Sequence, residues 1–363
     1  MALSPFYGWA EPDNSSLVKN GAQDIRALGD AIDTSLWNVG FGQAGKNKII
    51  NGDFGIWQRG TSFTLTGSGA NNYTADRFNA QFDGTGATCT VSQQAFTAGA
   101  APVAGYEGQF FARWNRSAAG SSNTLNYYKQ AIEDVRTFAG QPVTLSFWAK
   151  ADTARTLTAQ IYQEFGSGGS GAVLALNGTA SVTTSWQRFT ISATVPSITG
   201  KTVGTGSSLT LYFIMPTGVA FTFDYWGVQL EYGSKATPFE TATGTIQGEL
   251  AACQRYYYRS TSSNAYGIFG SGIGYNSTTC AITTNLPVSM RVVPSSVDFS
   301  TLTLFDIVGA SNTVTTCTLD TNQTTFNTGV ANISAASGIT NYRTYYIRGN
   351  ASSSAYIAYN AEL

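Results

Sequence analysis

The side chains that could do chemistry in this chain of 363 residues are carboxylates, tyrosines and lysines, because the sequence contains no histidine. Ser-His and Cys-His nucleophilic sites are therefore excluded, as are the common zinc sites that contain histidine. Carboxylates alone can cleave glycosides when two of them flank the bond. Glu107, Glu164 and Glu231 could supply such a pair, but nothing in their spacing brings two of them together. The sequence thus predicts a protein that is not an enzyme.

The charge balance excludes partners that are held by a strongly basic surface. Lysine and arginine together number 20, against 21 aspartates and glutamates, so we expect no nucleic-acid partner. Charged residues make up only 11% of the chain, and Gly, Ser, Thr and Asn replace them, which suits short strands joined by tight turns. The longest apolar stretch, residues 209–223, is interrupted by Pro216 and Gly218. It is too short to cross a bilayer, so we expect no membrane insertion.

Residues 49 to about 242 repeat the alternation of strands with one buried face. Val143, Leu145 and Phe147 fall on one face, and the residues between them fall on the other. The same period of two recurs in residues 157–162, 189–195, 209–213 and 221–225. Clean alternation is typical of antiparallel sheets, and so many strands within this segment predict a β-sandwich or barrel.

The segment before residue 48 has a helical pattern instead. Its apolar residues recur at steps of three and four, with Leu28 beside the gap at Gly29. They are Val18, Ala22, Ile25, Leu28, Ile32 and Leu36. A lone helix of this length is only marginally stable in water, so it needs a partner. Packing on its own β domain and association with copies of the chain both meet that need, and the linker-like residues 40–45 favour self-association.

Several ordered blocks of sequence resemble one family of β-sandwich modules. Residues 49–54, IINGDF, followed by WQRG at residues 57–60, resemble the opening strand of galactose-binding-like jelly rolls, in particular carbohydrate-binding modules that begin with an N-G-x-F motif. Residues 223–231, FDYWGVQLE, resemble the last strand of those modules. Further blocks are similar to the version of this module found in phage and prophage fibre proteins, at residues 130–136, 145–151, 165–170 and 236–240. The resemblance covers roughly residues 49–260.

The two flanks carry shorter resemblances of the same kind. Residues 12–30 are similar to N-terminal segments of phage tail and fibre proteins that attach to the particle. Residues 286–291 and 359–363 are similar to C-terminal fibre domains. The resemblance implies a virion component, assembled in the host cytoplasm, that is usually a homotrimer and displays a β-sandwich outward. Its N-terminal segment would bind other virion proteins.

Pattern and resemblance together predict a mainly β fold in three regions. Residues 1–48 would form a virion-anchoring and oligomerisation helix with its linker. Residues 49–242 would form an antiparallel β-sandwich jelly roll of the carbohydrate-binding type. Residues 243–363 contain further strand-like runs separated by Ser, Thr and Asn, and would form a smaller C-terminal β-sandwich domain.

The resemblance also implies that one exposed face of a sheet binds ligand. The residues expected on this face are Trp148, Gln160 and Tyr162, with either Tyr128 and Gln130 or Tyr127 and Lys129 from a neighbouring strand. Sugars suit this mixture, because a pyranose stacks on an aromatic ring while amide side chains bind its hydroxyls. The alternative is that these aromatic side chains pack against a neighbouring subunit or the second sheet. A register slip of one residue would turn every side chain over.

A structural calcium ion is common in the related modules. The resemblance places one acidic ligand on the last strand, at Asp224, and another after the Phe of the opening motif, where this chain has Gly55. Asp53 could substitute, but Ca²⁺ takes about six to eight oxygen ligands and only two carboxylates can be named. The alternative, which we favour, is that Asp53 serves a turn and main-chain amides cap Asp224. We expect no other cofactor.

The leading hypothesis is a tail fibre or adhesin of a phage virion that attaches to host-surface glycans without enzymatic activity. A homotrimer would strengthen weak glycan contacts through effective concentration. The alternative is a structural head-decoration, collar or connector protein whose aromatic faces are buried against other virion subunits. A polysaccharide depolymerase is the third hypothesis, which the lack of histidine and of an evident carboxylate pair disfavours.

Overall fold

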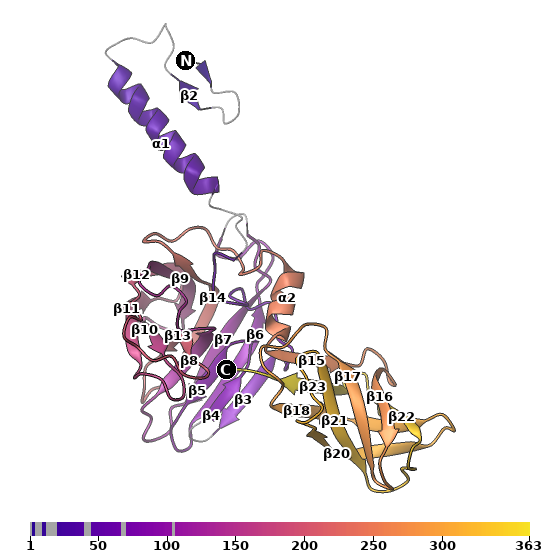
Figure 1. Ribbon diagram of the computed structural model, residues 1–363. Coiled ribbons are helices and arrows are strands. Elements are labelled where there is room, and N and C mark those ends of the chain that lie inside the picture. Colours follow the sequence, from indigo (N-terminus) through magenta and orange to yellow (C-terminus); the bar gives the residue numbers. More distant parts are fainter. Residues whose placement is uncertain (1, 4–8, 12–19, 40–44, 67–69, 104–105) are drawn as a thin grey trace.

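The computed structural model describes residues 2–3, 9–11, 20–39, 45–66, 70–103 and 106–363. Within these residues the chain is mainly β, as the sequence predicts, and its strands pair antiparallel. Two β domains are joined through helix α2 (Ile246–Gln254), and helix α1 (Gly21–Val39) lies apart from both (Figure 1). The short strands β1 (Ala2–Leu3) and β2 (Ala10–Glu11) pair with each other beside α1.

No helix among the described residues is both long and apolar enough to span a lipid bilayer.

The first β domain is a sandwich of two six-stranded sheets. The first sheet consists, in spatial order, of β11 (Val173–Val182), β10 (Arg155–Glu164), β13 (Ser208–Ile214), β8 (Asn126–Ile132), β5 (Asn79–Phe82) and β4 (Ala70–Tyr73). The second sheet consists of β12 (Gln187–Thr194), β9 (Pro142–Ala151), β14 (Phe221–Tyr232), β7 (Phe110–Ala118), β6 (Thr88–Ala95) and β3 (Ser62–Thr66). Most neighbouring strands are not consecutive in the sequence, which is the crossing arrangement of a jelly roll.

Alternation along the strands decides which face of each sheet is buried. In β10, Leu157, Ala159 and Ile161 are fully buried in the core between the sheets, and the residues between them are partly exposed. Strand β9 is an exception, because both of its faces are buried. Trp148, on its outer face, packs in a cluster with Phe239 from the segment that follows β14. The outer face of the second sheet is therefore covered at Trp148 by another segment of the chain. The outer face of the first sheet is partly exposed at β10.

The second β domain combines a closed barrel with a three-stranded sheet. The barrel consists of β16 (Ile268–Gly274), β17 (Thr279–Asn285), β21 (Thr328–Ala335), β20 (Ser311–Leu319), β19 (Leu302–Asp306) and β22 (Thr344–Gly349). The sheet consists of β15 (Tyr257–Thr261), β23 (Tyr356–Asn360) and β18 (Ser296–Ser300), and it shares one hydrophobic core with the barrel. The sequence predicts a smaller β-sandwich domain here. In the structure, six of its strands close into a barrel that packs with the three-stranded sheet.

Helix α2 is fixed to the sandwich by its first turn and by a buried glutamate. The side chain of Thr245 caps the helix, because its Oγ1 accepts a hydrogen bond from Gly248 N at 3.1 Å. The Glu249 carboxylate accepts hydrogen bonds from Asn51 N at 2.8 Å and from Thr243 N at 2.7 Å. The helix thereby holds the opening segment of the sandwich in place.

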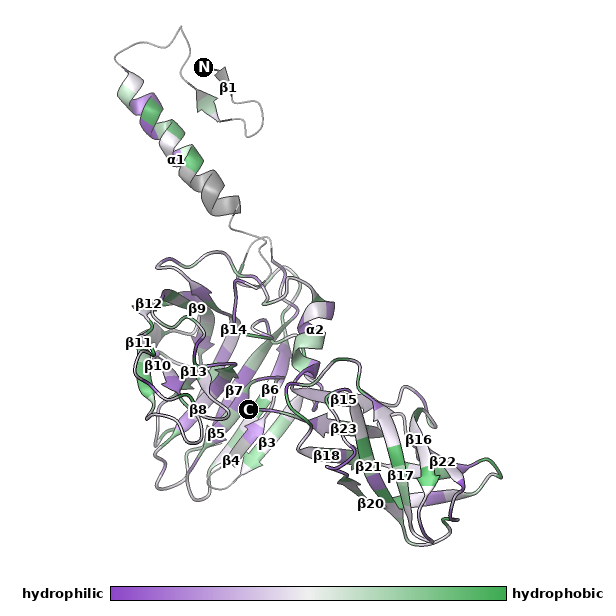
Figure 2. Cartoon of the chain, viewed as in Figure 1, coloured by the Kyte–Doolittle hydropathy of each residue, from purple (hydrophilic) through white to green (hydrophobic). Residues whose placement is uncertain are grey.

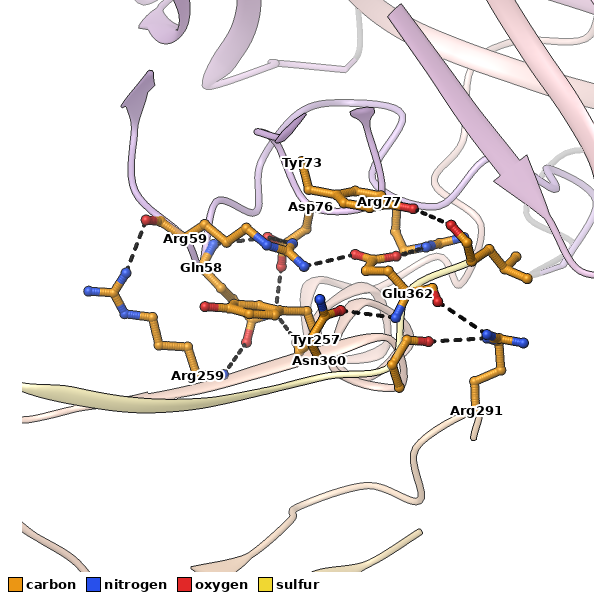
Figure 3. Close-up of polar contacts among 12 residues, drawn as sticks. Gln58, Arg59, Tyr73, Asp76, Arg77, Tyr257, Arg259, Arg291, Asn360 and Glu362 are labelled. Carbon is orange, nitrogen blue, oxygen red and sulfur yellow. Dashed lines mark hydrogen bonds and ion pairs between the residues drawn. The ribbon is translucent and has the colours of Figure 1, made fainter. Parts of the chain in front are cut away.

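The end of the chain returns to the sandwich and joins the two domains (Figure 3). Glu362 pairs with Arg59 at 3.1 Å and with Arg77, whose side chain is 1% exposed. The Arg59 and Arg77 guanidinium carbons lie 3.5 Å and 3.4 Å from the ring centroids of Tyr257 and Tyr256, respectively. We call these five residues the domain joint. Because its arginines come from the sandwich and its other members from the chain after α2, the joint couples the two domains.

Candidate functional site

The outer face of the first sheet gathers tyrosines and polar side chains from three adjacent strands. Gln160 of β10 lies opposite Tyr212 of β13, and Tyr212 lies opposite Lys129 of β8. Tyr162, two residues after Gln160, and Tyr127, two residues before Lys129, point to the same side. All five side chains are half-buried, whereas the residues between them along each strand are buried in the core. We call these five residues the tyrosine face.

The three rings of the tyrosine face contact one another edge to face. The ring centroid of Tyr212 lies 5.6 Å from that of Tyr127 and 5.8 Å from that of Tyr162, with interplanar angles of 83° and 88°. Aromatic pairs of this geometry stabilise each other beyond their burial of area. Because Tyr212 contacts both neighbours, the rings form one aromatic surface that is partly open to solvent. The apolar face of a pyranose can stack on such a surface.

Polar side chains around the rings are held in place by hydrogen bonds. Gln160 Nε2 donates to Asn177 Oδ1 at 3.0 Å, and Lys129 Nζ donates to Gln81 Oε1 at 3.1 Å. An amide has two N–H donors and an oxygen with two lone pairs, so one bond leaves most of its capacity unused. These groups can therefore bind the hydroxyls of a sugar that stacks on the rings.

Glu164 lies beside the tyrosine face and binds three hydroxyl groups. Its carboxylate accepts hydrogen bonds from Tyr212 Oη at 2.5 Å, from Thr210 Oγ1 at 2.8 Å and from Ser208 Oγ at 3.2 Å. Burial, together with this hydrogen bond to Glu164, raises the pKa of Tyr212 well above its usual value. The phenol keeps its proton at neutral pH, and Glu164 holds the Tyr212 ring in position.

The carboxylates that could form a hydrolase pair lie in three separate places. Glu231 is buried in the second sheet, where its Oε2 accepts a hydrogen bond from Thr237 Oγ1 at 2.6 Å. Glu107 lies outside the strands and accepts a hydrogen bond from Gly99 N at 2.7 Å. Glu164 lies at the edge of the tyrosine face, where its carboxylate accepts hydrogen bonds from Tyr212 and Thr210. No contact among the described residues brings two of these three carboxylates to one site.

A small cavity of about 120 Å³ opens at one end of the tyrosine face. Lys129 and Glu164 line it, together with Tyr73 of β4 and Leu363 from the end of the chain. Tyr73 Oη donates a hydrogen bond to Leu363 O at 2.8 Å. The end of the second domain thus forms one wall of the site, and the domain joint positions that wall.

Gln160 and Tyr162 lie on the tyrosine face, but Trp148 does not. Trp148 belongs to the second sheet, where it is 7% exposed in a cluster with Trp226 and Phe239. The prediction that it shares an exposed face with Gln160 is therefore wrong. Trp148 does point away from the core, as the alternation of β9 predicts, but the segment that carries Phe239 covers it.

Tyr128 and Gln130 do not lie on the tyrosine face either, because their side chains point inward, which corrects the first of the two registers weighed for this strand. Tyr128 is fully buried, and its ring stacks on that of Phe54 with 6.2 Å between centroids. Gln130 is 1% exposed; it accepts a hydrogen bond from Ile50 N and donates one to Ile50 O, both at 2.9 Å. The alternative pair, Tyr127 and Lys129, is the one that points outward. Packing of Tyr128 in the core decides the register.

Tyr212 is the central residue that sequence reasoning missed. The sequence carries a signal for it, because residues 209–213 have a period of two: Leu209, Leu211 and Phe213 share one face of the strand, so Tyr212 points to the other. Nothing in the sequence placed that strand between β10 and β8, and only this position makes Tyr212 the neighbour of both outer tyrosines.

The two predicted calcium ligands do not meet. Asp224 accepts hydrogen bonds from Arg113 at 2.7 Å and 2.8 Å and lies 3.5 Å from Lys150 Nζ. These cations, rather than main-chain amides, balance its charge, which corrects that expectation too. Asp53 accepts a hydrogen bond from Gly55 N at 3.3 Å, as expected of a turn residue. The donors do not fit a calcium ion shared by both aspartates, and the part of the chain that the structure describes holds no cluster of three His, Cys, Asp or Glu side chains.

The predicted anchor residues belong to α1 and the segment before it. Val18 lies outside the described residues, and so does the side chain of Leu36. Hydrophobic and hydrophilic residues alternate along the part of the helix that is coloured by hydropathy (Figure 2). Among them Ile25 is 67% exposed, Ala22 is exposed, and Leu28 and Ile32 are half-buried. The helix thus presents apolar side chains to solvent in the single chain.

No family model and no curated protein matches the chain. Among solved structures, a family 4 carbohydrate-binding module (CBM4) is 19% identical and matches 50% of this chain and 98% of its own, with a TM-score of 0.30. The CBM22-1 xylan-binding domain of Paenibacillus barcinonensis Xyn10C is 15% identical and matches 47% of this chain and all of its own, with a TM-score of 0.31. The enzymatically active domain of tailspike protein 4 from bacteriophage CBA120 is 14% identical and matches 52% of this chain and 22% of its own, with a TM-score of 0.32.

Proposed function

We propose that this protein is a non-enzymatic, glycan-binding component of a phage virion, a tail fibre or adhesin, and that it binds sugar on the tyrosine face. The observation that carries the binding proposal is the alignment of Tyr162, Tyr212 and Tyr127 across three neighbouring strands of one open sheet face. The rings supply a stacking surface, and Gln160 and Lys129 supply hydrogen bonds beside it. The virion assignment rests on the sequence blocks that resemble phage fibre proteins.

Tyr162→Ala is expected to weaken glycan binding by about tenfold, because aromatic anchors at binding sites contribute more than about 1 kcal/mol each. The melting temperature should change little, since the ring is half-buried and lies on the open face of the sheet. Binding is measured by adhesion of the purified full-length protein to intact host cells and by titration with the glycans released from their surface.

The matched control is Tyr232→Ala, because Tyr232 is a 63% exposed tyrosine on the second sheet of the same domain. It should bind like the wild type. Equal adhesion of the Tyr162→Ala variant and the wild type would contradict sugar binding by the tyrosine face. A wild-type oligomer that does not adhere to host cells would instead favour a decoration or connector role.

We further propose that α1 associates with copies of itself to form a homotrimer and attaches the protein to other virion proteins. Light scattering should then give about three times the chain mass of 38.5 kDa. Replacing Ile25 and Ile32 by aspartate should convert the trimer to a monomer, because charged side chains would occupy the apolar face of the helix. Ile307→Asp, at a 75% exposed position in the second domain, is the control. A trimer that survives the double substitution would exclude α1 as the association surface.

A further inference from the structure

We propose that the tyrosine face selects a glycan whose sugar residue carries a carboxylate, and that Lys129 binds this carboxylate. The inference rests on the proposed function, because it names the class of glycan for the same site. It starts from the cation of the face, which lies on β8 beside the cavity. Lys129 lies between Tyr212 of β13 and Asn79 of β5 in the pairing of the strands.

The ammonium of Lys129 has unused binding capacity. Its Nζ donates to Gln81 Oε1 at 3.1 Å and lies 5.7 Å from the ring centroid of Tyr212. An ammonium has three N–H donors, so this neutral partner leaves two of them for a ligand. Among the described residues, no carboxylate lies within ion-pair distance of this nitrogen, that is within 4.0 Å. Burial lowers the pKa of Lys129, and the Glu164 charge offsets only part of that effect; a bound anion would offset the rest.

Neither of the charged side chains that share the cavity with Lys129 forms an ion pair with it. Glu164 lines the same cavity, but its oxygens are occupied by the hydroxyl groups of Tyr212, Thr210 and Ser208. Arg77 also lines the cavity, but it is paired with Glu362 in the domain joint. Lys129 is therefore the cation on this face that a ligand can reach and that forms no ion pair within 4.0 Å among the described residues, although the Glu164 charge acts on it from across the cavity.

The chemistry of the face favours a carboxylate over a phosphate. A sugar carboxylate carries one negative charge, which a single ammonium can balance, and it is attached to a pyranose ring that can stack on Tyr212. A phosphate monoester carries about two negative charges at neutral pH and is bound by clusters of cations or main-chain N–H groups. Since Arg77 is already paired, the face supplies one cation without an ion-pair partner, and no such cluster among its described residues.

The test compares acidic polysaccharides with their carboxyl-reduced forms. The purified full-length protein is titrated with polygalacturonate, alginate and hyaluronan, each beside the same polymer after reduction of its carboxylates to alcohols. We expect at least one acidic polymer to bind about tenfold more tightly than its reduced form, with a preference that shrinks as salt is raised. Free glucuronate should compete for the site better than glucose 6-phosphate.

Lys129→Met should abolish this preference, so that the acidic polymer binds no more tightly than its reduced form, and Lys129→Arg should restore much of it. Lys201→Met, which removes a lysine from an exposed loop elsewhere on the sandwich, should leave the preference unchanged. Melting temperatures near that of the wild type show that Lys129 is not needed for folding.

Equal binding of acidic and reduced polymers would overturn the inference and leave the proposed function intact. Stronger competition by glucose 6-phosphate would assign Lys129 to phosphate instead, and would overturn it as well. If neither form of any polymer binds, the inference fails, and adhesion to host cells then decides the proposed function separately.

Discussion

Replacing Glu362 by alanine is expected to lower the free energy of unfolding by about 3–5 kcal/mol, the effect of removing one partner from a buried ion pair. Glu362 is 5% exposed and Arg77 is 1% exposed, so neither charge is balanced by water. Without the carboxylate, Arg77 would keep only Ala131 O, to which it donates, and the Tyr256 ring above it. The Arg77 guanidinium would then be a buried charge without a counter-charge, which strongly destabilises the folded state.

The same substitution should also separate the two domains. Arg59 would lose its 3.1 Å partner at the same time, so both arginines of the sandwich would lose their link to the end of the chain. Calorimetry of the variant is therefore expected to show two unfolding transitions where the wild type shows one. Because Leu363 follows Glu362 and lines the cavity beside the tyrosine face, glycan binding should weaken as well.

Arg136→Gln is the matched control for this prediction. Arg136 pairs with Asp134 at 2.6 Å, but its side chain is 60% exposed. Exposed ion pairs contribute about 1 kcal/mol or less, so urea denaturation should show little change. If the Glu362→Ala variant lost as little stability as the Arg136→Gln variant, the domain joint would not hold the domains together.

Trp148→Ala is expected to lower the free energy of unfolding by about 3–5 kcal/mol, because it removes a large side chain from a packed cluster. The Trp148 ring centroid lies 5.3 Å from that of Trp226, and the Arg188 guanidinium carbon lies 4.5 Å from the Trp148 centroid. The variant would leave a cavity beneath Phe239 that the neighbouring rings cannot fill without moving. Glycan binding by molecules that remain folded should be unchanged.

Tyr162→Ala is the contrasting variant, since it should reduce binding and leave stability within about 1 kcal/mol of the wild type. Thermal unfolding followed by fluorescence, together with adhesion assays on both variants, separates the two roles. If Trp148→Ala lost adhesion at an unchanged melting temperature, Trp148 would be a ligand contact and its buried position in the cluster would be contradicted.

The strands of the sandwich were predictable because each one carries its own signal. Leu157, Ala159 and Ile161 alternate with polar residues, and a strand that buries one face must have this period. The mainly β class and the outward direction of Gln160 and Tyr162 follow from that local pattern. Alternation says which residues share a face, but it does not say what lies on top of that face.

Trp148 and Tyr128 mark the two limits of local reasoning. Trp148 points away from the core as its strand predicts, yet a distant segment that carries Phe239 covers it. The strand of Tyr128 allowed two registers, and the ring of Phe54, far away in the sequence, decides between them by packing against Tyr128. Both outcomes depend on contacts between residues that the chain does not bring together until it folds.

The sequence by itself therefore determined the class of fold, most strand faces and the absence of histidine chemistry. The tertiary structure alone decided that β13 lies between β10 and β8, which makes Tyr212 the centre of the tyrosine face, and that Glu362 returns to Arg77. The physical reason is the range of the interactions. Periodicity reflects the backbone geometry of each strand, whereas strand order, covered faces and buried ion pairs arise from burial of distant segments against one another.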